Sequence, residues 1–460
     1  MVELWLYTFL EVSWYSVNQT ASTLISQAHG AESTSAKHGW FAISLVAAAI
    51  GSTFVAISGL STELVLSQIT PDKELVRLGA KFTEAVVPAI YFSGFHGVIS
   101  TYFTASGYAE YSTICSFFYC FLDIFLTYIF LFGGLGIQPF DNPLLAIAQS
   151  WNVSSFFGLV LNAVLFARVM RAETAEADEA KEKPMAVAST SSSPQQEHRD
   201  RPPTQRRYSD LDEYLDVVKD AELMTEEKTV VQWLGSQLAW RRFFSQWIPT
   251  CITSATENMI FFVLGLFVAH LSRSQIAAHN TCSAIIEYAF SLSYGMFEAT
   301  SVRIGYYVGK GDYTGSMTVL WMSVVNSFVI GILLAILCAH YSLEIAQLFT
   351  QDQEIIAYIL QVSPLLYASI AIFSSGDQML AILQGQGRTK IEMFSSLFAL
   401  WGITLPLAAY FFFLRDGALV EIWWALLVGY IVMEVIAGYC VYLSDWESLF
   451  LRAKEYAELD

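Results

Sequence analysis

Two carboxylates stand inside long apolar runs of this sequence, where a lipid environment would penalise them. Glu257 lies in the run 240–271, and Asp377 lies in the run 355–383. A charged side chain at the centre of a bilayer costs about 2.5–3.5 kcal/mol on insertion scales, so such residues usually face a bundle interior or a water-filled cavity. Burial away from water also raises the pKa of a carboxyl group. The two residues therefore predict a site at which a driving ion and a cationic cargo compete.

Weaker candidates follow from the same reasoning. Asp123 lies in the run 112–134, with Thr127 one helical turn later on the same face. Glu287 lies in a later run, and His96 carries a side chain that titrates near neutrality. For each of them a hydrogen bond that merely joins neighbouring helices is the alternative. We expect acids near the ends of the runs to reach headgroups instead: Glu11, Glu63, Glu84, Glu298, Glu344 and Glu434.

Apolar runs long enough to cross a bilayer dominate the chain. Hydrophobic residues make up 55% and charged residues 14% of its 460 residues, whereas a soluble domain has about 25% charged residues. A membrane-crossing helix needs about 20 mostly apolar residues. Such runs occur at 3–25, 40–66, 75–104, 112–134, 144–169, 242–271, 276–299, 316–343, 354–384, 392–414 and 419–443. They predict an all-α, multi-pass membrane protein of the plasma membrane or of an internal, vacuole-type membrane.

A polar segment interrupts these runs. Residues 171–235 are rich in Glu, Ser, Pro, Gln and Arg and cannot bury enough apolar surface to offset chain entropy, so we expect a disordered linker. Lys and Arg concentrate on the side of the membrane that holds the linker. We assign that side to the cytoplasm, together with a tail at 446–460. This orientation places Met1 outside, and no secretory signal peptide is visible.

The chain also repeats itself at a spacing of about 280 residues. Asp72 in TPDKE corresponds to Asp352 in TQDQE. Halves with an even number of helices insert with the same polarity, a plan that secondary transporters use. The repeat predicts two parallel-repeat lobes, with five helices in 1–170 and six in 236–445. The partner of the run that contains Glu257 would precede residue 1, so we expect that the first helix of the plan is missing.

The second half contains motifs that are specific in combination. They are QIAAHN, SYGMFEATSVRIGYYVGKGD, SPLLY, GQGRTK and GITLPLA, with Pro249 eight residues before Glu257. The first half contributes ISQAHGAE, TASGYAE and PLLAIAQS. Over about 1–170 and 235–445 the chain resembles the multidrug and toxic compound extrusion (MATE) family. The resemblance implies two six-helix lobes around a cleft, so that residues 1–170 would be the counterpart of helices two to six.

The resemblance also implies a function and a site. The function is antiport by alternating access, in which organic cations, drugs or metabolites leave in exchange for H⁺ or Na⁺. Glu257 matches a helix-seven carboxylate, Asp377 with the adjacent Gln378 matches a helix-ten Asp, and Asp123 matches a polar position in helix five. The helix-one Asp of prokaryotic members has no counterpart here. The coupling ion and the route therefore stay open.

Two other functions compete with export. A lipid-linked oligosaccharide flippase of the same superfamily would need a cationic cavity, whereas these runs carry acids. A membrane scaffold or an inactive remnant is the other alternative, given the expected missing helix. The sequence shows no nucleotide-binding loop, hydrolase motif or spaced Cys/His cluster. We therefore expect no enzyme, cofactor, metal or nucleic acid, but a monomer that carries a small-molecule cargo across the lipid bilayer.

Overall fold

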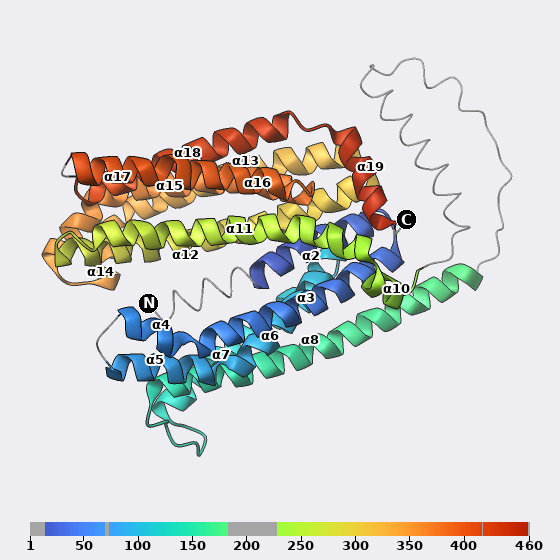
Figure 1. Ribbon diagram of the computed structural model, residues 1–460, viewed down its shortest axis with the longest axis horizontal. Helices are drawn as coiled ribbons and strands as arrows, with labels where there is room; N and C mark the ends of the chain where they lie inside the picture. Colours follow the sequence, from blue (N-terminus) through green and yellow to red (C-terminus); the bar gives the residue numbers. More distant parts are fainter. Residues whose placement is uncertain (1–13, 70–72, 183–227, 416, 459–460) are drawn as a thin grey trace.

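The computed structural model describes residues 14–69, 73–182, 228–415 and 417–458 (Figure 1). Within these ranges the chain is helical, apart from turns and one isolated bridge between Gly134 and Ile137. The helices gather in two groups that lie closest at the end with α10 and α19 and diverge toward the other end (Figure 1). This arrangement confirms the predicted all-α membrane class.

The N-terminal group contains α3 (Thr34–Leu60), α4 (Thr62–Ile69), α5 (Lys73–Ala85), α6 (Val87–Ala105), α7 (Ala109–Phe132) and α8 (Pro143–Glu182). The C-terminal group contains α11 (Gln237–Val268), α12 (Arg273–Lys310), α13 (Tyr313–His340), α14 (Ser342–Phe349), α15 (Gln353–Gly385), α16 (Thr389–Ser396), the π-helical segment Leu397–Thr404, α17 (Leu405–Leu414), α18 (Leu419–Tyr442) and α19 (Trp446–Ala457). Two further helices, α2 (Ser16–Gly30) and α10 (Val230–Gly235), lie where the groups meet (Figure 1).

Most of the predicted runs are long apolar helices. In the described part of the chain eight helices are long and apolar enough to cross a membrane, and α5 with α6 forms a ninth candidate that is bent by 46°. The two remaining runs correspond to α12 and α2. Helix α12 is continuous, but Glu287 and Glu298 interrupt its apolar sequence, and α2 is 15 residues long. Polar residues in these two helices indicate that they are stabilised by protein contacts more than by lipid.

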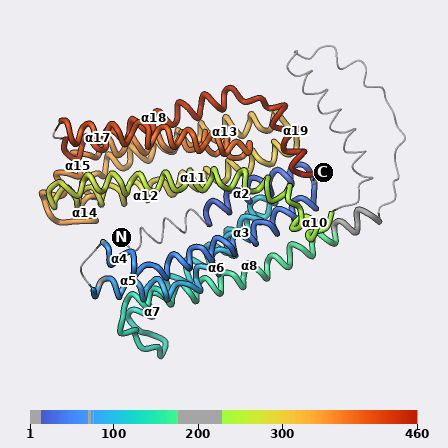
Figure 2. Tube along the Cα trace, in the orientation of Figure 1, coloured from blue at the N-terminus to red at the C-terminus, as the bar shows by residue number. Residues whose placement is uncertain are grey.

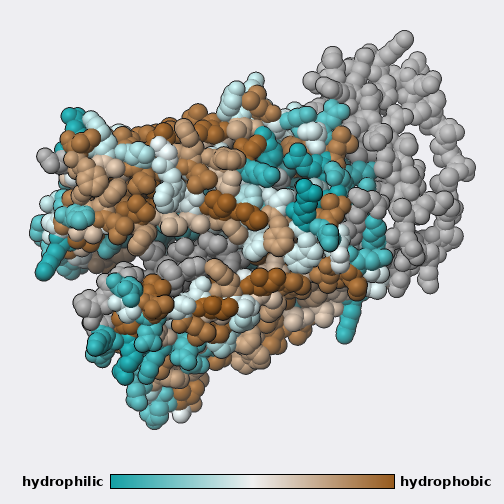
Figure 3. Space-filling model, viewed as in Figure 1, coloured by the Kyte–Doolittle hydropathy of each residue, from teal (hydrophilic) through white to brown (hydrophobic). Residues whose placement is uncertain are grey.

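On the face shown in Figure 3, apolar side chains occupy much of the surface of both groups, beside hydrophilic ones. Phe117 and Phe121 on α7 are each 74% exposed, and Leu333 on α13 is 61% exposed. The buried core of the C-terminal group lies between α12, α15 and α18, and the N-terminal group packs around Trp40 and Tyr102. An apolar exterior is what a lipid environment requires, because the tails are as apolar as the side chains themselves.

The predicted linker differs from the structure at both ends. Helix α8 continues through residue 170 to Glu182. Helix α10 occupies 230–235, where Trp233 is buried against Trp40 at a ring distance of 4.9 Å. The boundaries 171 and 235 were therefore wrong, because an amphipathic helix can dock on a neighbour despite polar composition. Residues 183–227 lie outside the described range.

The predicted tail also packs against the protein. Helix α19 buries Trp446, Leu449 and Phe450 and lies beside α2 and α12. Figure 2 shows this red helix next to blue segments from the beginning of the chain. Arg242 of α11 holds the end of α19, since its guanidinium donates to the Glu455 side chain at 2.9 Å. The segment therefore joins the two groups rather than extending from them.

Helix α2 lies at the contact between the two groups, which we call the seam. Nearly all its polar side chains are buried there. Gln27 donates to the Gly385 carbonyl at 2.8 Å, and Ser22 donates to Glu298 at 2.8 Å. A Cβ atom at Gly309 would overlap the backbone oxygen of Gln27. Close backbone approach through glycine is how membrane helices gain packing contacts. The seam places the beginning of α2 against the interior of the C-terminal group.

Candidate functional site

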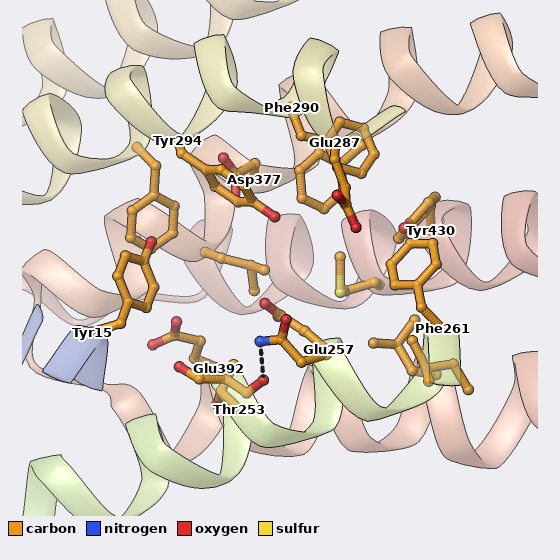
Figure 4. Close-up of a pocket in the computed structure, with 18 of the residues that line it drawn as sticks. Tyr15, Thr253, Glu257, Phe261, Glu287, Phe290, Tyr294, Asp377, Glu392 and Tyr430 are labelled. Carbon is orange, nitrogen blue, oxygen red and sulfur yellow. Dashed lines mark hydrogen bonds between the residues drawn. The ribbon is translucent and has the colours of Figure 1, made fainter. Parts of the chain in front are cut away.

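A cavity of about 280 Å³ lies within the C-terminal group and is closed on one side by the residues at the beginning of α2. Four acidic side chains line it, from four different helices: Glu257, Glu287, Asp377 and Glu392. Figure 4 shows Glu257 and Glu392 on one side and Glu287 and Asp377 on the other. None of the described residues that line the cavity is basic. The cavity therefore favours a positively charged occupant.

Helices α11 and α16 position the first pair of acids. Ser396, the last residue of α16, donates to Glu257 Oε1 at 3.0 Å. Glu392 lies one helical turn before Ser396, so it is on the same face of α16. Beyond Ser396 the backbone widens into the π-helical segment, where Trp401 donates to the Thr256 carbonyl at 3.3 Å. Short π-helical segments are frequent at functional sites.

Helix α15 positions Asp377 from the opposite wall. The Asp377 side chain is 4% exposed, and its Oδ2 accepts no hydrogen bond from any described residue. The adjacent Gln378 does not line the cavity but joins α15 to α12, since Thr300 donates to its Oε1 at 2.7 Å. The structure thus separates the two neighbours that the sequence grouped together.

Aromatic rings form much of the remaining wall. Phe290 of α12 stacks on Phe373 of α15 with ring centroids 3.8 Å apart, and Tyr430 of α18 meets Phe373 edge-on at 5.2 Å. Tyr15 and Tyr294 also line the cavity (Figure 4). An aromatic face attracts a cation within about 6 Å of its centroid. Carboxylates and aromatic faces together suit an organic cation better than a hydrated metal ion.

The N-terminal candidates lie elsewhere and are paired. Ser154 of α8 donates to Asp123 Oδ1 at 2.7 Å, and the hydroxyls of Thr127 and Ser150 are 2.7 Å apart. His96 on α6 lies between glycines and bonds to α8, with its Nδ1 2.8 Å from the Asn162 amide nitrogen. These residues connect α6 and α7 to α8. The structure does not bring Asp123, Thr127 or His96 to the cavity.

The acids expected at headgroups divide into two classes. Glu63, Glu84 and Glu344 are exposed, and Glu11 lies outside the described residues. The expectation was wrong for two others, because Glu298 bonds to α2 and Glu434 accepts a hydrogen bond from Ser375 at 2.8 Å. Both lie in the helix–helix contacts around the cavity wall rather than at the surface.

Sequence reasoning missed Glu392. It stands at the first residue of a predicted span, so it resembled the acids at other span ends. In the structure α16 begins earlier, at Thr389, and the Glu392 side chain is only 2% exposed. The available signal was its spacing of four residues from Ser396 on a helix whose partner carries Glu257. That signal has meaning only when the pairing of α11 with α16 is known.

A family model and a known relative match the sequence of this chain. The family model MatE matches residues 4–129 and 249–410, together more than half of the chain. The probable multidrug resistance protein NorM of Xanthomonas campestris is 29% identical over 196 residues, which is 42% of this chain and 42% of that protein. The matched part of the chain thus spans less than half the length of this curated relative.

Two solved structures share the fold. The crystal structure of the eukaryotic MATE transporter AtDTX14 matches with a TM-score of 0.75 at 18% identity, covering 98% of this chain and 89% of that chain. A MOP superfamily transporter from Pyrococcus furiosus, described by the reverse polarity of its binding pocket, also gives a TM-score of 0.75, at 14% identity over 99% and 88% of the two chains. At such identities the similarity shows the fold alone. The chain is a multi-pass membrane protein that belongs to the MatE family.

Proposed function

We propose that the protein is a secondary active antiporter that exports organic cations in exchange for H⁺ or Na⁺. The observation that carries the proposal is the gathering of four acids, without a basic partner among the described lining residues, in one aromatic-walled cavity. Protonation, or a bound Na⁺, would neutralise the carboxylates and release the cargo. The similarity to NorM, a probable multidrug resistance protein, supports export of drugs as the direction.

Glu257 and Asp377 are the proposed coupling groups. They reach the cavity from α11 and α15, which lie on opposite walls (Figure 4). Ser396 keeps Glu257 oriented by a hydrogen bond, whereas Asp377 Oδ2 has no donor among the described residues. A cargo held by both groups would therefore connect two helices of the C-terminal group. Neither group would hold the driving ion and the cargo at full strength together.

The polarity of the cavity supports an exporter of cations over a flippase. Two structures with equal TM-scores to this chain include one described by a reversed pocket polarity, so this fold accommodates different pockets. Fold similarity alone consequently gives no cargo. The acidic lining favours a cation over a lipid-linked sugar phosphate, which would be repelled.

Transport by the purified protein in vesicles tests the proposal. A fluorescent organic cation should move when a proton or a sodium gradient is imposed, each gradient being applied separately. Glu257→Gln and Asp377→Asn should each reduce gradient-driven transport at least about tenfold, the size expected for one lost charged interaction. The matched control is Glu344→Gln, which changes an exposed acid of α14. Full transport by both cavity variants would refute the assignment, and transport that ignores both gradients would refute antiport.

A further inference from the structure

An open apolar groove of about 390 Å³ lies between α3 and α6 of the N-terminal group. Its wall consists of one residue of α6 and five residues of α3: Phe95, Leu45, Val46, Ala49, Ile50 and Thr53. The Tyr91 hydroxyl of α6 donates to Thr53 Oγ1 at 3.1 Å, which joins the two helices beside the groove. None of the six residues belongs to the lining of the acidic cavity. The groove is therefore a second, separate concavity.

The α3 side of the groove continues as an apolar face to the end of that helix. Val46, Ile50, Thr53, Ile57 and Leu60 follow one another at spacings of three and four residues, so they share one face. The four aliphatic members are all exposed. From Val46 to Leu60 the helix rises roughly 20 Å. One leaflet contributes only about 15 Å of hydrocarbon, half of the bilayer core, so this face can accompany an acyl chain over its whole depth.

The α6 side of the groove leads to charged residues on α5. The helical hydrogen bonds continue through the bend between these helices, since Val86 N donates to Phe82 O and Ile90 N donates to Val86 O, each at 3.1 Å. One face therefore runs from the groove onto α5 at spacings of three and four residues: Phe95, Tyr91, Pro88, Glu84, Lys81, Arg77 and Lys73. Helix α5 also meets the end of α3, because a Cβ atom at Gly59 would lie 3.8 Å from Thr83 Cβ.

Three exposed cations, Lys73, Arg77 and Lys81, form what we call the basic face of α5. In the described part of the chain none of them forms an ion pair with an acid. Against these three cations α5 carries two acids, Glu74 and Glu84, which leaves the helix a net charge of +1. The chain as a whole has a net charge of −18. The basic face is thus an exception that suits an anionic partner.

We propose that an anionic phospholipid binds here, with an acyl chain in the groove between α3 and α6 and its phosphate against Arg77 and Lys81. Guanidinium and ammonium groups form strong, charge-assisted hydrogen bonds to phosphate. The lipid belongs to the leaflet at the end of the molecule opposite α10 and α19 (Figure 1). At the same end of the C-terminal group, α14 carries Glu344 and no basic residue, so the proposed site is specific to the N-terminal group.

Lipid titration followed by native mass spectrometry tests the proposal on the purified, delipidated full-length protein in detergent. The probes are phosphatidylglycerol and phosphatidylcholine with identical acyl chains. The unaltered protein should bind one phosphatidylglycerol about tenfold more tightly than phosphatidylcholine, because two cations attract the anionic lipid. Glycerol 3-phosphate in excess should not displace the lipid, since it has the phosphate but no acyl chain.

Variants separate the headgroup from the acyl chain. Replacing Arg77 and Lys81 together by Gln should lower phosphatidylglycerol affinity about tenfold and leave phosphatidylcholine affinity within about twofold. Ala49→Trp fills the groove and should weaken both lipids alike, and Val46→Ser is a second groove variant that adds no volume. The matched control replaces Arg273 and Arg415, exposed cations at the same end of the C-terminal group, by Gln. Thermal melting shows whether each variant remains folded.

Four results would overturn the proposal. The first is equal affinity for the two lipids in the unaltered protein, and the second is an equal loss of phosphatidylglycerol in the control variant. Displacement by glycerol 3-phosphate would show a phosphate site without a lipid. A dimer that Ala49→Trp abolishes would place a second copy of the chain in the groove. Each result leaves the proposed antiport untouched, because the groove and the acidic cavity share no residue.

Discussion

The two helical groups place ionisable residues inside the membrane in contrasting ways. In the N-terminal group Asp123 and His96 are each hydrogen-bonded to a residue of α8, and these bonds connect α6 and α7 to α8. In the C-terminal group four acids converge on a cavity, and Asp377 and Glu392 keep an unpaired oxygen. An acid in an apolar run is therefore not by itself a sign of function. What distinguishes the proposed transport site is the gathering of four acids around one cavity.

The backbone explains part of this difference. Pairs of hydroxyl side chains join helices in both groups, as with Ser93 and Ser155, 3.0 Å apart, and with Ser293 and Ser374, 2.9 Å apart. In the C-terminal group α11 contains Pro249, and α16 widens into the π-helical segment after Ser396. Irregular turns shift side chains out of the register that would close the gap. The cavity therefore lies beside two irregular helices.

The largest effect is expected at the seam that closes the cavity. Gly309→Ala would place a methyl group against the Gln27 backbone, which cannot move away as a side chain can. We expect a loss of about 3 kcal/mol in stability. Gly295→Ala, on the same helix with nothing near its added Cβ, should be neutral or slightly stabilising. Thermal melting of the two variants provides the measurement, and equal melting temperatures would contradict a tight seam.

An effect of intermediate size is expected for two serines, one in each helical group. Ser154 and Ser396 are both buried and both donate to a carboxylate, at 2.7 Å and 3.0 Å. Replacing Ser154 by Ala should cost about 1.5 kcal/mol of stability with transport per folded molecule unchanged. Replacing Ser396 by Ala should lower transport several-fold, because Glu257 loses its orientation. Transport and melting assays on both variants test the comparison, which would be broken if the two serines behaved alike.

The smallest effect is expected for the N-terminal acid. Asp123→Asn retains an oxygen that can accept from Ser154, so the helices stay joined. Gradient-driven transport should remain within about twofold of the unaltered protein. A tenfold loss in the vesicle assay would show instead that Asp123 shares in coupling, and that both groups handle the driving ion.

The sequence alone was enough to predict the class of this protein and to select two of the acids that line its cavity. Runs of apolar residues specify membrane helices because backbone polar groups must be satisfied without water. Glu257 and Asp377 could be selected as candidates because a carboxylate within an apolar run is costly in lipid. The positions of the runs also gave nine of the spanning elements, with the bend between α5 and α6 visible only in the structure.

Tertiary structure decided which acids meet. Asp123 and Glu257 each lie within an apolar run, and the runs alone do not show which of the two reaches a cavity. Only the packing of α11 against α16 brings Glu392 beside Glu257, and only the packing of α8 gives Asp123 its partner. Helical spacing fixes which residues share a face, but it cannot fix which face another helix will cover. The partners of a buried charge, and hence its function, are set by that second choice.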